Sequence, residues 1–287
     1  MILNFEQPSL SQKEAVDRIV AEQGVRMCDQ TFGNIFCWAK VADAQLAIYK
    51  NTFVSKWHGM IAAPQGPQRK ELIEGLLAEG AERLIGIDEP YKKWLEEQFE
   101  GRFSFKERRA GADYIYDRKA LETLKGKKLA AKRNHINFFE NNCRWEVKLL
   151  DDGTLEDAAR FNDWWCAEND CGAESSLMRE GCAVRRGLRH FKELGFFGII
   201  LYADGAPCAF SYGEPMGKEG FCVHVEKANA DLRGAYPMVN RELVKRLDPA
   251  IRWINREDDT GDEGLRKAKL SYRPMELLMK YTAEVMK

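Results

Sequence analysis

The side chains best suited to chemistry gather in one charged run, residues 253–274. Its sequence is W-I-N-R-E-D-D-T-G-D-E-G-L-R-K-A-K-L-S-Y-R-P. Three consecutive acids repel one another unless water or cations take up their charge, so the run predicts either a solvated loop tip or a polar site. Glu257 and Asp258 are candidate catalytic residues, as a general base or as binders of an acceptor amine. The carboxylates of the run are Glu257, Asp258, Asp259, Asp262 and Glu263.

A short helix is expected directly after these acids. Leu265, Ala268 and Tyr272 recur at helical spacing, and Asp262 is a good N-cap. Acidic residues at its start and basic residues at its end suit the helix dipole, so a well-capped helix after a strand explains the pattern equally well. If the run is a site, Tyr272 is a candidate catalytic hydrogen-bond donor, and the candidates for substrate binding are Asn255, Arg266 and Lys269.

A second charged stretch, residues 118–133, is basic and contains a single acid, Glu122. Such stretches are usually solvated faces. On a helical wheel, however, Lys132 falls within an apolar stripe, with Arg133 and His135 at its borders. Buried cations need partners, so we expect Lys132 or Arg133 to contact at least one of the three consecutive acids. Lys132, Arg133 and His135 are therefore further candidates for substrate binding.

Together the two stretches resemble a known family. The run N-R-E-D-D-x-G-D-E-G-L-R-K-A-K-x-S-Y-R-P, with K-R-N-H-I-N at residues 132–137, is similar to the family built around the C-terminal domain of phosphatidylglycerol lysyltransferase. Many members of that family are soluble proteins of unknown function. The resemblance implies two tandem domains of the acyl-CoA N-acyltransferase (GNAT) type, related to the aminoacyl-tRNA-dependent transferases that build peptidoglycan cross-bridges. Its precedent implies lysyl-tRNA and a membrane lipid as substrates.

The resemblance also implies a place for the acyl donor. A GNAT domain holds its donor where two parallel strands splay apart, and N–H groups at the following helix start bind the donor's phosphates. Here that place falls at residues 231–236, so the candidate cofactor-binding residues are Arg233, Gly234 and Ala235. The match to the usual Gln/Arg-x-x-Gly-x-Gly/Ala loop is partial, because Asp231 and Tyr236 depart from it. Tyr212 is a further candidate for binding substrate.

The order of expected elements fits an α/β fold with mixed sheets. The first half is expected to contain helices at 11–23, 68–80 and 91–99, and strands at 35–38, 44–49, 52–57 and 84–87. The second half is expected to contain helices at 126–142, 155–169, 178–194 and 235–247, and strands at 196–202, 207–212, 221–227, 251–255 and 275–285. We expect a first GNAT-like domain at 1–115 and a second, carrying the donor site, at 116–287.

Composition limits the remaining classes of protein. Apolar content of 45% and aromatic content of 11% in 287 residues indicate a folded chain. No long apolar run or basic leader occurs, so we expect no transmembrane segment and no export. Eight scattered cysteines without a C-x-x-C pair suit a reducing cytoplasm, and four histidines without metal-pair spacing predict no metal site.

Three classes of function stay open on this reasoning. The first is an N-acyl or aminoacyl transferase that uses acyl-CoA or aminoacyl-tRNA as donor and an amine or hydroxyl acceptor on a small molecule, a peptide or a lipid headgroup. The second is a non-catalytic ligand-binding or regulatory module on the same fold. The third is an RNA-contacting factor that uses the basic stretch, although a net charge of -1 supplies no global attraction for tRNA or other RNA. Oligomeric state is not predicted.

Overall fold

The computed structural model describes residues 3–169 and 176–286. The chain forms two compact units, each built from separate parts of the sequence. Unit 1 comprises Met1–Ile115, Glu257–Lys267 and Glu276–Lys287, and unit 2 comprises Tyr116–Arg256 and Ala268–Met275. The division into domains at 1–115 and 116–287 stays a prediction.

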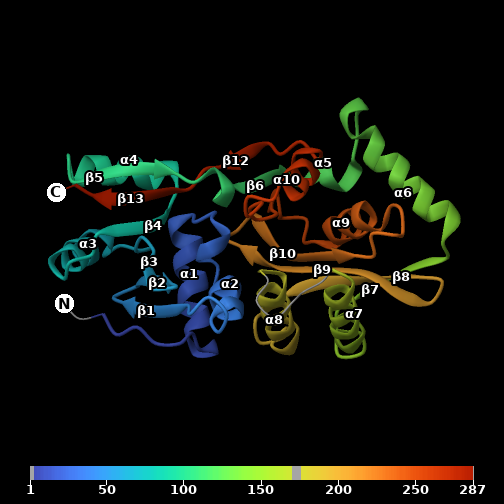
Figure 1. Ribbon diagram of the computed structural model, residues 1–287, viewed down its shortest axis with the longest axis horizontal. Coiled ribbons are helices and arrows are strands. Elements are labelled where there is room, and N and C mark those ends of the chain that lie inside the picture. The colour runs from blue at the N-terminus through green and yellow to red at the C-terminus, as the bar shows by residue number, and fades with distance from the viewer. Residues whose placement is uncertain (1–2, 170–175, 287) are drawn as a thin grey trace. The chain divides into compact units, whose positions relative to one another are not determined.

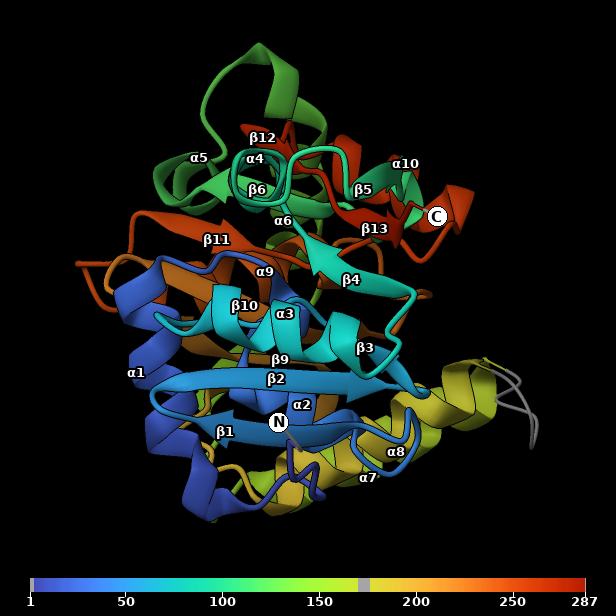
Figure 2. The ribbon, with the colours of Figure 1, turned by 90° about the vertical axis from the view of Figure 1, so that its left-hand side faces the viewer.

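The first sheet of unit 1 is an antiparallel meander of three strands. Lys50 and Asn51 form the expected tight turn between its first two strands, with φ angles of 41° and 64°. Figure 2 views this unit from the side on which α3 crosses between β2 and β4. The elements are α1 (Lys13–Gln23), α2 (Phe32–Trp38), β1 (Gln45–Tyr49), β2 (Thr52–Trp57), β3 (Met60–Ile61), α3 (Arg69–Ala78) and β4 (Arg83–Ile87).

The strand expected at residues 35–38 is wrong, because these residues belong to helix α2. Thr31 caps this helix, since its hydroxyl accepts a hydrogen bond from the Asn34 N–H. Six of the seven residues of α2 are buried, including Asn34. A short helix buried on all sides has no polar face, so its hydrophobic pattern does not distinguish it from a buried strand.

The second sheet of unit 1 includes a strand from the end of the chain. β13 (Tyr281–Val285) lies between β4 and β5 (Phe103–Glu107) and is antiparallel to both. The single strand expected at 275–285 is therefore divided into β12 (Glu276–Leu278), which pairs with β6 (Asp113–Asp117), and β13. The core under this sheet includes Ile73, Leu84 and Leu95, and α4 (Glu89–Gln98) packs there.

The sheet of unit 2 has the strand order β6-β11-β10-β9-β8-β7. Of β6, only Tyr116 and Asp117 belong to this unit. β8 and β9 form the expected hairpin, and Asp204 and Gly205 at its turn have φ angles of 52° and 87°. In Figure 1, α7 and α8 lie on one face of β8–β10 and α9 lies on the other. The strands are β7 (Trp145–Leu149), β8 (Phe197–Ala203), β9 (Ala206–Met216), β10 (Gly220–Ala228) and β11 (Trp253–Asn255).

The expected helices of the second half are confirmed with shifted ends. The helix expected after Asp262 is also present, and the carboxylate of Asp262 accepts the Leu265 N–H at 2.6 Å, as the capping pattern predicts. Within the described residues, no helix has the length and hydrophobicity that a membrane span requires. The helices of the second half are α5 (Arg118–Thr123), which was not expected, α6 (Ala130–Asn142), α7 (Leu155–Glu168), α8 (Ser176–Arg189), α9 (Ala235–Arg246) and α10 (Glu263–Leu270).

Candidate functional site

The two parallel strands of unit 2 pair over three residues. Gly220–Cys222 of β10 pairs with Trp253–Asn255 of β11, where β11 ends. β10 continues to Ala228, so its residues 223–228 extend beyond the parallel pairing. Helix α9 follows β10 and precedes β11, which completes the β-α-β unit in which a splay accommodates a ligand. The place where β10 runs past the end of β11 is the candidate donor site.

The loop that precedes α9 packs against α6. Gly234 has a φ of 99°, and a Cβ at this position would lie 2.2 Å from the backbone oxygen of His135. Arg233 Nε donates toward His135 Nδ1 at 3.3 Å, and its guanidinium lies 4.5 Å from the ring centre of Phe138. Arg233, Gly234 and His135 are thus brought together, in contacts that hold α9 to α6.

The first turn of α9 has few N–H groups available for a phosphate. The Ala235 N–H donates to the Leu232 carbonyl, and the Met238 N–H donates to the Gly234 carbonyl, both at 3.0 Å. Pro237 has no N–H, and Asp231 adds a negative charge in the loop. A helix start with these groups engaged is a poor match to a pyrophosphate-binding loop.

A buried charged group bridges β10 and the end of β11, which we call the Glu226–Arg256 centre. Arg256 Nη2 lies 2.7 Å from Glu226 Oε1, and Asn240 Nδ2 of α9 donates to Glu226 Oε2 at 2.8 Å. The Arg256 guanidinium lies 4.6 Å from the ring centre of Tyr272, whose face also carries Lys132 Nζ at 4.1 Å. Burial and the nearby charge of Arg256 lower the pKa of Lys132.

The predicted residues of unit 2 therefore fall into two groups. Lys132 and Tyr272 belong to the Glu226–Arg256 centre, and Lys269 Nζ donates to the Arg256 carbonyl at 2.6 Å. Burial raises the pKa of Tyr272, which keeps its hydroxyl protonated. Tyr212, by contrast, donates to the Val184 carbonyl at 3.2 Å within the core.

The remaining predicted residues of unit 2 have local roles. Arg133 Nη1 donates to the carbonyls of Leu124 and Gly126 and closes the turn before α6. Asn255 is fully buried and pairs with Cys222 in the sheet. The expected contact of Lys132 or Arg133 with the acids stays a prediction, because these cations belong to unit 2 and the acids to unit 1.

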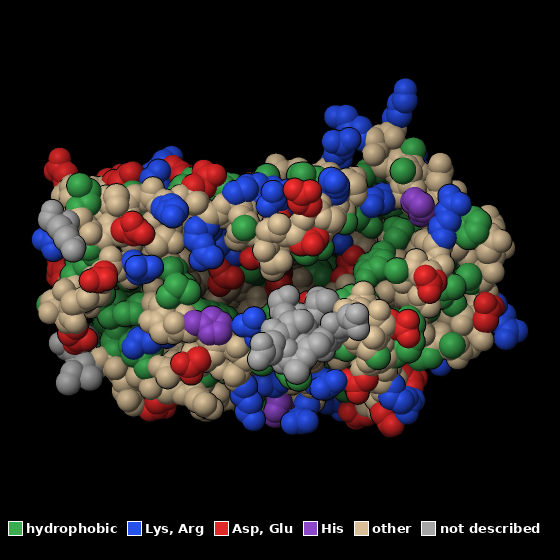
Figure 3. Space-filling view, viewed as in Figure 1, with side chains coloured by type: hydrophobic (Ala, Val, Ile, Leu, Met, Phe, Trp, Pro, Cys, Tyr) green, Lys and Arg blue, Asp and Glu red, His purple; other side chains and the backbone are tan. Residues whose placement is uncertain are grey.

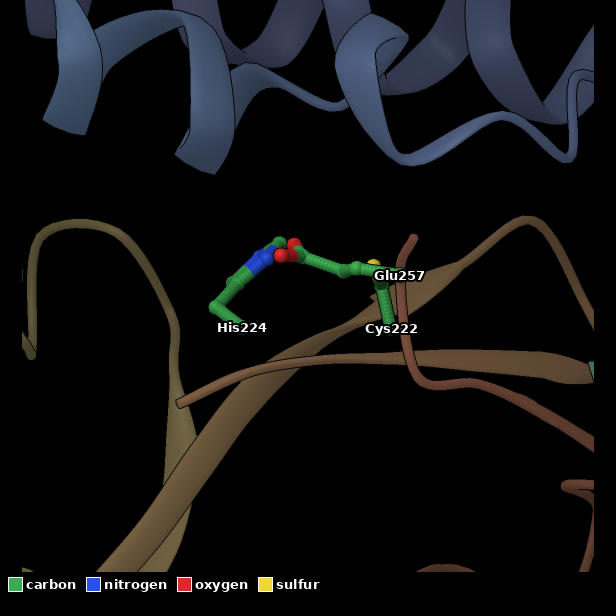
Figure 4. Close-up of side chains that lie close together, drawn as sticks. All are labelled: Cys222, His224 and Glu257. Atoms are coloured by element: carbon green, nitrogen blue, oxygen red, sulfur yellow. The ribbon is translucent and has the colours of Figure 1, made fainter. Parts of the chain in front are cut away.

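A histidine and a glutamate on neighbouring strands form a pair that sequence reasoning missed. His224 Nε2 lies 2.9 Å from Glu214 Oε1, and the two side chains are only 7% and 3% exposed. A carboxylate in this position fixes the orientation of the imidazole. Figure 4 shows His224 and Cys222, which stand two residues apart on β10. The Met216–Gly220 turn, which makes β9 and β10 neighbours, was the available signal.

Asp259 is held by cations and a hydroxyl of unit 1. Arg266 approaches it with two nitrogens at 2.9 and 3.0 Å, Arg109 Nη1 lies at 3.1 Å, and the Tyr114 hydroxyl donates at 2.6 Å. Burial raises the pKa of Asp259, but the hydrogen bonds from Arg266 and Tyr114 outweigh this effect and hold it well below its ordinary value. Arg266 thus stabilises an ionised, fully buried carboxylate.

Glu257 and Asp258 differ from this neighbour. Glu257 Oε1 accepts a hydrogen bond from Asn34 Nδ2 at 2.8 Å, and its backbone has a φ of 57°. Burial raises the pKa of Asp258 to about 6, although the charge of Lys280 opposes the shift. A carboxyl that titrates near neutral pH suits proton transfer, which gives the role predicted for Asp258 a physical basis. The roles of Glu257 and Asp258 both stay predictions.

The fold defines the class of protein. The sheets and crossovers are those of the GNAT fold, and a GNAT-family acetyltransferase from Colwellia psychrerythraea aligns with a TM-score of 0.52 over all of both chains at 9% identity. The family model "Phosphatidylglycerol lysyltransferase, C-terminal" matches residues 22–284, and the chain belongs to this family.

Two solved structures agree with this assignment. A conserved protein of unknown function from Bacteroides thetaiotaomicron is 35% identical, with a TM-score of 0.93 over 99% of this chain and 100% of that one. L-PGS from Bacillus licheniformis is 16% identical, with a TM-score of 0.64 over 97% of this chain and 92% of that one. The tandem GNAT-like fold expected from the sequence is confirmed.

Proposed function

We propose that the protein is a transferase that moves an acyl or aminoacyl group to an amine or hydroxyl acceptor, with the donor held in unit 2. The observation that carries this proposal is the short parallel pairing of β10 with β11, past which β10 continues, in a chain of the phosphatidylglycerol lysyltransferase C-terminal family. The adjacent Glu226–Arg256 centre supplies buried charge and hydrogen-bond donors beside the end of that pairing.

The proposed donor is aminoacyl-tRNA rather than acyl-CoA. The engaged N–H groups at the start of α9 do not favour binding of a pyrophosphate. Lys125, Lys127 and Lys128 are exposed in the turn between α5 and α6, and Figure 3 shows Lys and Arg side chains gathered at this projection. Clustered exposed lysines bind a nucleic-acid backbone through its phosphates.

The proposed proton acceptor is His224, oriented by Glu214. In the transfer step the acceptor nitrogen or oxygen attacks the ester carbonyl carbon of the donor and passes its proton to the imidazole. The carbonyl–oxygen bond to the tRNA then breaks, and the imidazolium returns the proton to the departing ribose oxygen. Tyr272 keeps the catalytic role proposed from the sequence, as a hydrogen-bond donor. The roles of Glu257 and Asp258, which belong to unit 1, stay predictions from the sequence and are not part of this reaction.

The donor class is tested by ligand-induced changes in melting temperature. Acetyl-CoA, longer acyl-CoAs, uncharged tRNA and aminoacyl-tRNA are compared at matched ionic strength. Stabilisation by aminoacyl-tRNA supports the proposal, and stabilisation by a CoA ester alone contradicts the choice of donor. Binding of a donor without transfer to any acceptor would support the non-catalytic module instead.

The basic turn is tested by the salt dependence of tRNA binding. Replacing Lys125, Lys127 and Lys128 with Ser should weaken binding and reduce the slope of log K against log salt by about 2–3, because each lysine displaces roughly one counterion. The matched control replaces the exposed lysines Lys148, Lys192 and Lys218 of the same unit with Ser. Equal slopes for the two triple variants would place the tRNA elsewhere.

A further inference from the structure

Unit 1 contains a cavity of about 200 Å³ that the proposed transfer reaction does not use. Asp29, Asp258 and Lys280 provide its charged wall, and Trp57 and Tyr281 provide aromatic surface. Pockets for drug-sized ligands run from about 300 to 1,000 Å³, so this cavity suits a smaller metabolite.

The charged wall is net negative. Lys280 Nζ lies 2.7 Å from Asp113 Oδ1, behind the wall, and 2.9 Å from Asp29 Oδ2, so two carboxylates share one buried ammonium. Asp258 adds a further carboxylate. Burial raises its pKa most, Lys280 opposes that shift, and the charges of Asp29, Asp113 and Glu257 add to it. Arg108 also lines the cavity but its side chain is exposed to solvent, where its charge is screened.

A buried amide in the same wall lacks hydrogen bonds. Gln30 is fully buried, and within the described residues neither its Nε2 nor its Oε1 has a partner. Leaving such groups unsatisfied in the interior destabilises the fold. Gly86, also in the wall, leaves the space for this side chain, because a Cβ there would lie 2.9 Å from Gln30 Nε2. The amide is therefore a built feature that a ligand would satisfy.

We propose that this cavity binds a small primary amine that also carries a carboxamide or carbonyl group. The ammonium is placed at Asp258 and Asp29, and the amide or carbonyl pairs with Gln30. Trp57 and Tyr281 also line the cavity with aromatic side chains, a residue type that attracts cations. This site goes beyond the proposed transfer function and does not depend on it.

An organic cation suits the wall better than a metal ion does. Calcium and magnesium require about six oxygen ligands arranged around the ion. The Lys280 ammonium already lies among these carboxylates and would repel a divalent ion. An amine with a hydrogen-bonding tail uses both the carboxylates and the Gln30 amide.

The test is calorimetric titration of the full chain with two probes, β-alaninamide and butylamine, at pH 7.5. We expect β-alaninamide to bind with a Kd of about 0.1–1 mM, in keeping with its small number of atoms, and butylamine to bind more weakly. Asp258→Asn should weaken both probes at least about tenfold, as expected when a charge-assisted hydrogen bond is lost. Gln30→Met should lower the affinity for β-alaninamide to that for butylamine. It should leave the affinity for butylamine unchanged. Asp43→Asn, an exposed acid of unit 1, should leave both unchanged.

A second measurement is independent of binding heat. In carboxyl-carbon NMR titrations, bound β-alaninamide should move the pKa of Asp258 down toward its ordinary value, because the ammonium favours the ionised form. The proposal is overturned if the wild-type protein, with an intact circular dichroism spectrum, does not bind β-alaninamide, or if millimolar Mg²⁺ displaces this probe. It is also overturned if Asp258→Asn or Gln30→Met binds β-alaninamide as tightly as the wild type does. None of these outcomes bears on acyl transfer.

Discussion

At the scale of single residues, Lys280 illustrates how unit 1 tolerates a buried cation. Its side chain is 4% exposed and pairs with the fully buried Asp113, which also accepts the Cys28 N–H at 2.7 Å. Lys280→Met leaves that carboxylate without its cation, and we expect a loss of about 3–5 kcal/mol in the free energy of unfolding. Chemical denaturation measures it, with Lys106→Met on an exposed face of β5 as control. A loss equal to that of the control would contradict the pairing.

The pKa of Asp258 predicts a pH dependence of stability. Burial raises this pKa to about 6, above the ordinary value of 3.8, so between these values the folded state binds the proton more tightly than the unfolded state. Stability from this group therefore falls as pH rises through this window and levels off above it, by about 3 kcal/mol in total. Asp258→Asn should remove that part of the profile in denaturation series from pH 4 to 7.5. An unchanged profile would refute the shift.

Sequence reasoning found the residue types of these sites but not their environments. The three consecutive acids were visible as a repelling group, yet Asp259 is neutralised by Arg109 and Arg266 while Asp258 stays half-buried beside a cavity. Gln30 left no signal in local spacing, because tertiary packing creates its surroundings. The His224–Glu214 pair could be found only through the turn that makes β9 and β10 neighbours. The fold alone determines which side chains distant in sequence become neighbours of these residues.

At the scale of elements, the contact of α9 with α6 depends on one glycine. Gly234→Ala places a Cβ 2.2 Å from the His135 carbonyl oxygen at a φ of 99°, so we expect a loss of roughly 2–4 kcal/mol from overpacking and backbone strain. Gly217→Ala is the matched control, because its φ of 63° is also positive but nothing lies within 4 Å of the added Cβ. The control should lose only about 1 kcal/mol. Equal losses, measured by denaturant unfolding, would show that packing against α6 contributes nothing.

Long periodic helices and turns with specific residues were predictable, and several short elements were not. The helix at α6 was expected because its hydrophobic pattern repeats, and the Asp204–Gly205 turn was expected because its residue types favour positive φ. The missed elements include α2, whose seven residues lack a polar face, and the five-residue strands β5 and β7. Their identity depends on neighbours that the local sequence does not reveal.

At the scale of the whole molecule, the end of the chain is part of the core of unit 1. β13 lies between β4 and β5, and Ala283 within it is fully buried. A chain that stops at Met279 leaves both neighbouring strands without their pairing partner, so we expect the amides of β4 and β5 to lose hydrogen-exchange protection. A chain shortened only by the exposed Met286 and the residue after it should keep that protection. Retained protection in the shorter chain would contradict the observed strand order.

The most direct measurement follows a radiolabelled lysyl group from lysyl-tRNA to acceptors, with small amines and glycerophosphoglycerol offered in parallel. The account predicts transfer to at least one acceptor by the wild-type protein, slowed by about 10²–10⁴ in His224→Gln, because the proton acceptor is lost. His190→Gln, which alters a surface His–Glu pair of 3.3 Å in the same unit, should transfer at the wild-type rate. Label that stays on the tRNA with every acceptor, or equal rates for His224→Gln and the wild type, would contradict the reaction proposed for unit 2.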